Sequence, residues 1–261
     1  MNVRISDEML EKGFIVIPFP DVLKEQMLQH IRSYIGQVTH RNEEDLTKSV
    51  MSLSDENFSN ILGNKPFRMF PDHVAKELYE WASNLDSFLG GVQAGINYVN
   101  ESEAKINQQL REDSYDIYWR CVRPGRKDIG AAHADYQFWE LHKGTEYEAR
   151  VAFPYDERWK IWIPLLGCVS TNSLQVIPGS HKENIPITIC STKNGLRPDI
   201  ESRWLAENEQ RFMCPFKKFT DCCLLFHDKL VHKGPPNQES ALRISAELTI
   251  ILKLATDPLL V

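Results

Sequence analysis

The strongest constraint on the fold is a run of short, strand-like segments that fills the chain after about residue 114. These segments are rich in β-branched and aromatic residues, and turns built from glycine, proline or asparagine separate them. Many short strands punctuated in this way favour a closed or double-layered antiparallel β fold over βαβ units. The expected strands are Tyr115–Val122, Val151–Phe153, Lys160–Leu166, Ser173–Ile177, Pro186–Cys190, Cys222–Phe226 and Ile244–Leu254.

The first third of the chain predicts mainly helices. Residues 13–19 read as a short strand, and Asp21 is placed to cap a helix that stops near Gly36. Residues 40–72 are polar and mixed, which predicts mostly loop with one short helix. An apolar stripe with helical spacing, from Val74 to Val92, predicts a further helix. We expect a single domain over residues 1–261, with a helix-rich part (1–111) packed against a β core (112–254).

Composition narrows the class of protein. The chain has 261 residues, of which 42% are hydrophobic, and a net charge of −6. This balance argues against non-specific nucleic-acid binding, which needs a basic footprint. No apolar stretch approaches the ~18 residues that span a bilayer, and the start of the chain lacks a secretory pattern. We therefore expect a cytoplasmic protein with no membrane or nucleic-acid partner, whose six cysteines are reduced thiols.

One tripeptide, His133-Ala134-Asp135, has the spacing of a metal-binding pair. Residues i and i+2 of a strand point to the same side, so His133 and Asp135 can both bind one metal ion. A single match of this kind also arises by chance, so a third ligand must come from elsewhere. The candidates are the other histidines: His30, His40, His73, His142, His181, His227 and His232.

The segment 219–248 narrows that choice and adds a binding site for an anion. An expected buried strand leads to His227, and His232 follows before a turn. Arg243 and Ser245 then stand two residues apart on the next strand. An arginine on a sheet interior is costly unless it meets a fixed anion, and its planar fork suits a carboxylate. We interpret Arg243 and Ser245 as a carboxylate-binding pair.

Taken in order, these motifs resemble those of a known family. The ordered set is His133-Ala134-Asp135, Trp162-Ile163-Pro164-Leu165, Pro178-Gly179-Ser180-His181, Phe226-His227 through Val231-His232, and Arg243-Ile244-Ser245. It resembles the phytanoyl-CoA dioxygenase-like branch of the iron(II)- and 2-oxoglutarate-dependent oxygenases, over about residues 112–254. The resemblance implies a mainly β fold with α-helices, whose core is a double-stranded β-helix (jelly roll) with N-terminal and flanking helices.

The resemblance also implies a metal centre. His133, Asp135 and His232 would form the facial triad that binds Fe(II), which leaves coordination positions for a co-substrate and for O2. His227 and His181 stand at positions that look structural in relatives.

For the co-substrate, the resemblance implies that Arg243, helped by Ser245, takes the distal carboxylate of 2-oxoglutarate and that Trp162 lines its pocket. Tyr118 and Arg120, on the strand before the metal motif, are candidates for holding its inner end. The resemblance implies a serine two residues after the second iron histidine, in contact with 2-oxoglutarate; this chain has Gly234 there, a departure that bears on one co-substrate hydrogen bond and not on the whole site.

The implied reaction is hydroxylation of a small organic molecule, with 2-oxoglutarate converted to succinate and CO2. A carboxylate at Asp135 favours this outcome over halogenation, because related halogenases have a small residue there. Two alternatives stay open. The same iron site serves desaturation, epimerisation or cyclisation, and a non-catalytic jelly-roll module would bind a metal or carboxylate without turnover.

Residues beside the metal motif are candidates for contacts with the substrate. Tyr136, Gln137, Trp139 and Glu140 flank it, and Arg120 lies on the preceding strand. Two long irregular stretches, 40–72 and 182–218, are candidate lids over the site, because long loops in compact domains are usually functional or mobile.

Overall fold

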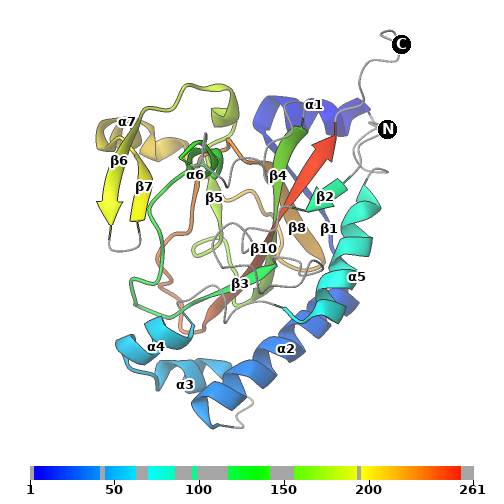
Figure 1. Cartoon of the computed structure of the whole chain (residues 1–261), viewed down its shortest axis with the longest axis vertical. Coiled ribbons are helices and arrows are strands. Elements are labelled where there is room, and N and C mark those ends of the chain that lie inside the picture. The colour runs from blue at the N-terminus through cyan, green and yellow to red at the C-terminus, as the bar shows by residue number, and fades with distance from the viewer. Residues whose placement is uncertain are drawn as a thin grey trace.

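A computed structural model describes residues 3–41, 45–62, 70–85, 96–98, 117–141, 156–192 and 195–253. Within these ranges most helices lie in the first part of the chain and most strands, which pair antiparallel, in the later part (Figure 1). The helices are α1 (Val3–Lys12), α2 (Asp21–Thr39), α3 (Leu46–Met51), α4 (Asp55–Ile61), α5 (Asp72–Ser83), α6 (Tyr136–Glu140) and α7 (Ser202–Asn208). The strands are β1 (Phe14–Pro18), β2 (Ile96–Tyr98), β3 (Tyr118–Val122), β4 (Asp156–Leu166), β5 (Gln175–Val176), β6 (Ile187–Thr192), β7 (Gly195–Ile200), β8 (Cys222–His227), β9 (His232–Lys233) and β10 (Arg243–Lys253).

The main sheet has the strand order β1-β8-β4-β10-β2, and β3 also pairs with β10. All these pairings are antiparallel. β5–β9 and β6–β7 form two separate two-stranded sheets. The predicted fold class, mainly β with helices and antiparallel sheets, is confirmed. The division into one domain with parts 1–111 and 112–254 stays a prediction.

The main sheet has two chemically different faces, because successive side chains of a strand point to opposite sides. One, the helix face, is apolar and shares a hydrophobic cluster with α2 and α5, which lie along one side of the sheet in Figure 1. It carries Trp119, Cys121, Ile161, Ile163, Ala246 and Leu248. The other, the site face, carries Tyr118, Arg120, Lys160, Trp162, Arg243, Ser245, Glu247 and Thr249, which lie opposite one another in the strand register.

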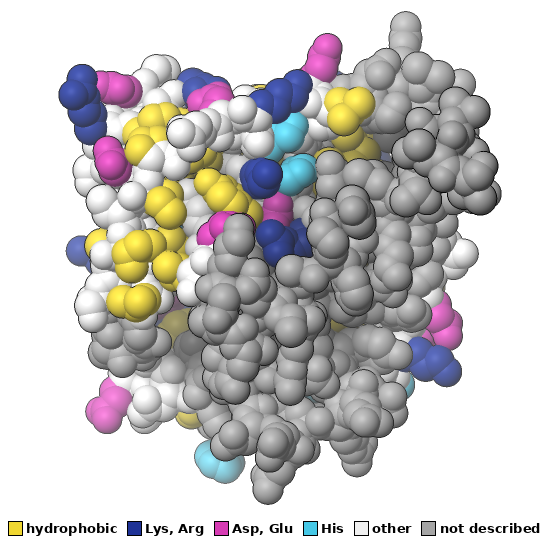
Figure 2. All heavy atoms as spheres, turned by 45° about the horizontal axis from the view of Figure 1, so that its top comes forward, with side chains coloured by type: hydrophobic (Ala, Val, Ile, Leu, Met, Phe, Trp, Pro, Cys, Tyr) yellow, Lys and Arg dark blue, Asp and Glu magenta, His cyan; other side chains and the backbone are white. Residues whose placement is uncertain are grey.

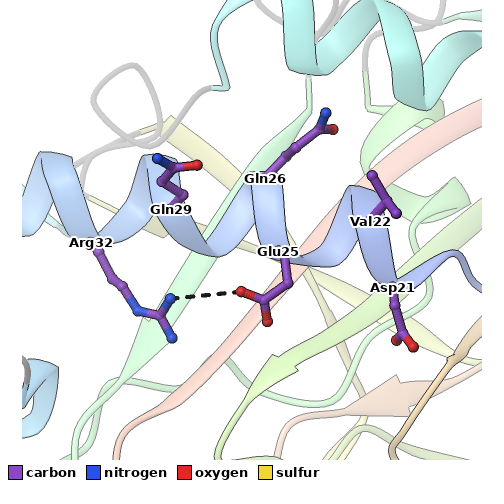
Figure 3. Close-up of a pocket in the computed structure, with 6 residues that line it drawn as sticks. All are labelled: Asp21, Val22, Glu25, Gln26, Gln29 and Arg32. Atoms are coloured by element: carbon purple, nitrogen blue, oxygen red, sulfur yellow. Dashed lines mark ion pairs between the residues drawn. The ribbon is translucent and has the colours of Figure 1, made fainter.

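Apolar spacing places α2 against the sheet. Met27, Ile31 and Ile35 are fully buried on one side of this helix, as its sequence pattern predicts. The opposite side carries polar side chains, and a shallow pocket there is lined by residues of α2 alone (Figure 3). Arg32 and Glu25 form an ion pair at 3.8 Å beside it. No candidate site residue lines this pocket.

The described part of residues 40–72 contains two short helices, α3 and α4, where the sequence predicted one. Each helix begins at a polar cap. The side chain of Asp45 accepts hydrogen bonds from the backbone N–H of Thr47 and Lys48 at 3.0 and 3.2 Å. Ser54 Oγ accepts one from Asn57 at 3.1 Å. These caps start α3 and α4, although both helices are short.

The stretch 182–218 is not irregular as predicted. It contains the hairpin β6–β7 and helix α7, which lie together at the edge of the molecule (Figure 1). The prediction captured β6 but missed β7, because Pro198 and the glycine at its start weaken the strand signal. A lid role for either stretch stays a prediction. The expected strand Val151–Phe153 and the end of the Val74–Val92 stripe lie outside the described residues.

Polar groups gather on one face of the molecule. In the space-filling view, histidine, basic and acidic side chains lie together near the upper centre, beside a hydrophobic region (Figure 2).

Within the described ranges, no helix has the length and hydropathy needed to cross a lipid bilayer.

One glycine allows the turn after β4 to lie close to the start of β10. Gly167 follows β4 with φ +62°, and a Cβ atom there would overlap the carbonyl oxygen of Leu242, the residue before Arg243. The turn can therefore approach the start of β10 only because residue 167 has no side chain.

We predict that Gly167→Ala lowers the free energy of unfolding by about 3 kcal/mol, because it combines a left-handed backbone with a backbone clash. Gly130→Ala is the matched control, since a Cβ there has no neighbour within 4 Å. Urea unfolding of both variants measures the difference. Equal midpoints for the two would contradict this account of the turn.

Candidate metal centre

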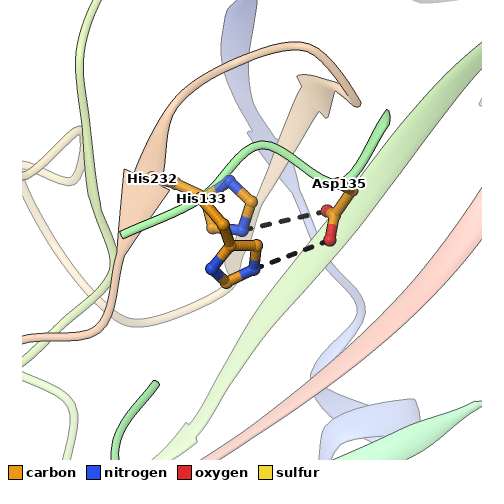
Figure 4. A group of neighbouring side chains, drawn as sticks. All are labelled: His133, Asp135 and His232. Atoms are coloured by element: carbon orange, nitrogen blue, oxygen red, sulfur yellow. Dashed lines mark ion pairs between the residues drawn. The ribbon is translucent and has the colours of Figure 1, made fainter. Parts of the chain in front are cut away.

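Three side chains from two separate segments meet on one side of the main sheet. His133 and Asp135 lie between β3 and α6, and His232 starts β9 (Figure 4). Their ligand atoms all lie within 4.8 Å of one another. Nε2 of His133 is 3.7 Å from Oδ1 of Asp135, and Nε2 of His232 is 3.8 Å from Oδ2. Among the described residues, this is the only group of three or more such side chains that could hold a metal ion.

Backbone pairing brings the two histidines together. The N–H of His133 donates to the carbonyl oxygen of His232 at 3.0 Å, and the N–H of His232 donates back to His133 at 2.9 Å. This isolated antiparallel bridge places their rings 4.4 Å apart between centroids. Side chains of directly paired residues share one side of a sheet, so both imidazoles face the same space.

Each imidazole is also held in one orientation and one tautomer. Nδ1 of His133 lies 2.8 Å from the carbonyl oxygen of Ala131, and Nδ1 of His232 lies 2.9 Å from that of Leu230. A carbonyl oxygen only accepts, so both Nδ1 atoms must carry the proton. Both Nε2 atoms then have a free lone pair, which is the arrangement that metal-binding histidines use.

The electrostatics also suit a cation. Burial, and secondarily the neighbouring His232, lower the pKa of His133 to about 4, which keeps its imidazole neutral near pH 7. Oδ2 of Asp135 is buried and has no hydrogen-bond partner among the described residues. Two imidazoles and one carboxylate, oriented in this way, fit a divalent iron ion with open coordination positions.

A lysine that sequence reasoning missed stands beside Asp135. Nζ of Lys160, on β4, lies 3.9 Å from Oδ2 of Asp135 and donates a hydrogen bond to Oγ1 of Thr249 at 2.9 Å. Lys160 is only 6% exposed. In the sequence it is the charged residue at the start of the otherwise apolar expected strand Lys160–Leu166, two residues before Trp162 and so on the same face.

Arg243 is buried on the site face at the start of β10, whereas Lys160 pairs with Thr249 farther along the same strand. Its Nη1 donates to the carbonyl oxygens of Asn172 and Pro235, while its Nε has no hydrogen-bond partner within the described ranges. No carboxylate of those ranges forms an ion pair with it. Burial lowers the pKa of this guanidinium to about 10. A cation in this setting is prepared for an anionic ligand.

The glycine at position 234 is explained by Arg243. A Cβ atom on Gly234 would lie 2.9 Å from Nη2 of Arg243, so a side chain there would compete with the guanidinium for space. Ser245 follows two residues after Arg243 on the same face and is buried. The structure therefore brings Arg243 and Ser245 together, as the sequence pattern predicts.

The remaining co-substrate candidates line the same face. Trp162 is buried and packs against Phe216, with ring centroids 5.5 Å apart. Tyr118 is buried on β3. Arg120 lies 3.8 Å from Glu247, and its charge acts on the pKa of both His133 and Arg243. Arg120 is thus electrostatically close to both ends of the site face.

The residues that follow the metal motif have mixed roles. The backbone N–H of Tyr136 donates to the carbonyl oxygen of Asp228 at 3.1 Å, and Lys229 lies over its ring at 5.9 Å. Gln137 is buried and accepts a hydrogen bond from Ala134, which is a structural contact. Trp139 belongs to α6, but its side chain lies outside the described part of the structure.

The other two histidines of the motifs lie apart from this group. Nδ1 of His227 accepts a hydrogen bond from the backbone of Lys229 at 3.0 Å, and its ring packs against Trp159. His181 packs on His227 and lies against Gly13. Neither histidine belongs to the group of possible metal ligands among the described residues, and their structural role stays a prediction.

Comparisons with known proteins agree with this geometry. A family model described as phytanoyl-CoA dioxygenase (PhyH) matches residues 9–245. No curated protein sequence matches the chain.

Solved structures with a similar fold include three at 14% identity. The first is EctD from S. alaskensis with 2-oxoglutarate and 5-hydroxyectoine, with a TM-score of 0.55 over 96% of this chain and 76% of that one. The second is EvdO2 from Micromonospora carbonacea var. aurantiaca, with a TM-score of 0.55 over 99% and 94%. The third is the epimerase SnoN with Fe3+, alpha ketoglutarate and nogalamycin RO, with a TM-score of 0.53 over 96% and 83%.

We predict that His133→Ala and His232→Ala each weaken Mn(II) binding by more than about 100-fold, since loss of a ligand costs more than loss of its support. Mn(II) replaces Fe(II) here because it resists oxidation, and titration calorimetry measures the affinity. His227→Ala is the control and should change the affinity less than about threefold. Similar losses in all three variants would refute the assignment of ligands.

Proposed function

The chain belongs to the phytanoyl-CoA dioxygenase (PhyH) family, and on this premise we propose that it is a mononuclear non-haem Fe(II)- and 2-oxoglutarate-dependent dioxygenase that hydroxylates a small organic molecule. The observation that carries the proposal is the convergence of His133, Asp135 and His232 with both Nε2 atoms available. These three groups would hold the iron ion.

The position of Arg243 supports 2-oxoglutarate as the co-substrate. Its buried guanidinium suits the far carboxylate of a diacid, and a fork of N–H donors recognises a carboxylate well. Ser245, two residues along the same face, is placed to add a hydrogen bond. Trp162 supplies an apolar wall between the two ends. Tyr118 and Arg120, on the strand that pairs with β10, would contact the end nearer the metal ligands.

The chemistry divides between the cofactor and the protein. When bound, Fe(II) supplies the reaction with O2 that converts 2-oxoglutarate to succinate and CO2 and oxidises the substrate. The protein contributes two imidazoles held in fixed orientations, one carboxylate and a buried cation for the diacid. Because these groups would hold the co-substrate at both ends, it would bind in a single orientation.

The reaction type and the substrate contacts belong to this proposal. Asp135 occupies the carboxylate position of the triad, which supports hydroxylation over halogenation. One similar structure is described as an epimerase, so another oxidative outcome at the same iron site is the alternative. Tyr136 and Trp139 are the candidates for contacts with the substrate, which we propose is a small molecule.

Succinate formation by the purified protein tests this proposal. We expect turnover of 2-oxoglutarate that requires Fe(II), 2-oxoglutarate and O2 together, with oxygen incorporated into the substrate from a panel of small molecules. His133→Ala should abolish succinate release, whereas His227→Ala should retain it. Tight binding of 2-oxoglutarate without any succinate across the panel would favour a non-catalytic binding module.

We also predict that Arg243→Met raises the half-saturating concentration of 2-oxoglutarate by about 100-fold, because truncating one partner of a buried charge pair costs about 2–5 kcal/mol. The stability of the metal-free variant should not fall, because the substitution removes a buried cation that no acid neutralises among the described residues. Arg197→Met, on the β6–β7 hairpin, is the control. A large loss of stability with unchanged half-saturation would assign Arg243 a purely structural role.

A further inference from the structure

The buried lysine beside Asp135 bears on how the site binds a metal ion and 2-oxoglutarate. Lys160 projects from β4 onto the site face, and the hydroxyl of Thr249 on the paired strand anchors its Nζ at 2.9 Å. Both side chains are almost fully buried. The ammonium lies 3.9 Å from Oδ2 of Asp135, the oxygen that has no hydrogen-bond partner among the described residues. A fixed positive charge therefore stands beside the one anionic ligand of the metal centre.

We propose that Lys160 couples metal binding to co-substrate binding: it weakens the binding of a divalent cation alone and strengthens the joint binding of that cation with the anionic 2-oxoglutarate. This inference rests on the proposed function, because it takes the three ligands and the diacid as given. It adds a role for a residue that is neither a metal ligand nor part of the Arg243 and Ser245 pair.

Two effects of the charge act in the same direction on the metal alone. The ammonium already attracts the Asp135 carboxylate, so an incoming cation competes with it for that ligand. The ammonium also repels the cation directly, and burial keeps this repulsion strong because solvent screens it little. A single opposite charge within about 4–6 Å lowers the pKa of a carboxylate by about one to three units, so we expect Lys160 to weaken the binding of a divalent ion at Asp135 by about tenfold or more.

The effect on 2-oxoglutarate has the opposite sign. The keto-acid end of this co-substrate is an anion that arrives at the same metal, so the lysine attracts it and offsets the repulsion that the metal experiences. A group that disfavours one ligand and favours the other increases their coupling, and linkage makes this coupling reciprocal. Wild-type protein should therefore bind metal much more tightly in the presence of 2-oxoglutarate than in its absence.

A purely positioning role for Lys160 predicts the reverse. If the lysine mainly held Asp135 in place, its removal would leave the carboxylate free to rotate and would weaken metal binding. The sign of the change in metal affinity thus separates the two roles. Thr249 fixes the ammonium in either case, so its hydrogen bond does not distinguish them.

The experiment measures Mn(II) affinity by titration calorimetry under anaerobic conditions, with and without saturating 2-oxoglutarate. We compare wild type with Lys160→Met, which keeps the length and apolar stem of the side chain but removes its charge. Without 2-oxoglutarate, Lys160→Met should bind Mn(II) at least about tenfold more tightly than wild type. The factor by which 2-oxoglutarate improves Mn(II) binding should fall by about the same amount.

Two further variants keep the result interpretable. Lys229→Met removes the same charge from the exposed turn between β8 and β9 and should change Mn(II) affinity less than about twofold, because solvent screens an exposed charge. Lys160→Gln retains a donor for Thr249 and carries the same expectation as Lys160→Met if the methionine variant does not fold. Thermal unfolding of the metal-free proteins verifies folding.

The outcomes separate this inference from the proposed function. Wild-type protein that binds no Mn(II) at these residues would remove the metal centre and with it the proposed function. Normal wild-type binding, together with unchanged or weaker binding in the uncharged Lys160 variants, would overturn the coupling role alone. Tighter binding in the variants with an unchanged effect of 2-oxoglutarate would also overturn it.

Discussion

Two backbone hydrogen bonds between His133 and His232 are the interaction on which the candidate site depends. They join a loop that follows β3 to a short strand near the end of the chain. Because the pairing is antiparallel and direct, it fixes where both imidazoles project. The carbonyl oxygens of Ala131 and Leu230 then fix which nitrogen of each ring is available. Main-chain geometry thus orients the histidine ligands before a metal ion binds, so little side-chain entropy is lost on binding.

The main sheet supports this arrangement by separating its two faces. Apolar side chains such as Ile161 and Leu248 pack under α2 and α5 and supply the hydrophobic stabilisation of the sheet. The site face is free to carry polar and charged groups, including Lys160 and Arg243. Burying such cations lowers stability unless hydrogen bonds or anions compensate. Their retention is understandable where an anionic ligand binds.

The parts of the site that sequence reasoning identified are those carried by regular spacing. Two residues separated by one along a strand share a side, which holds for Arg243 with Ser245 on β10. His133 and Asp135 also meet, but they lie in the loop after β3, where only an isolated bridge at His133 replaces the expected strand. The choice of His232 over His227 followed from the resemblance of the ordered motifs to a family, and the structure groups the chosen histidine with the other two. Trp162 came from the same resemblance, and Tyr118 and Arg120 from their place on the strand before the metal motif, whereas the strand register of the structure is what shows them on one face.

Other features depend on tertiary context that spacing does not encode. Lys160 is an ordinary lysine in the sequence, and only strand pairing places it beside Asp135 and Thr249. The short helices α3 and α4 start at single polar caps within a polar segment, where apolar periodicity is too weak to signal a helix. Strand β7 is defined by its hairpin partner β6, not by its own composition.

The most direct measurement is the anomalous difference density at the iron edge, from crystals grown anaerobically with Fe(II) and 2-oxoglutarate. The account predicts one iron peak bonded to Nε2 of His133, Nε2 of His232 and the carboxylate of Asp135, with the far carboxylate of the diacid on the guanidinium of Arg243. An iron peak elsewhere, or a diacid that leaves Arg243 without contact, would contradict it.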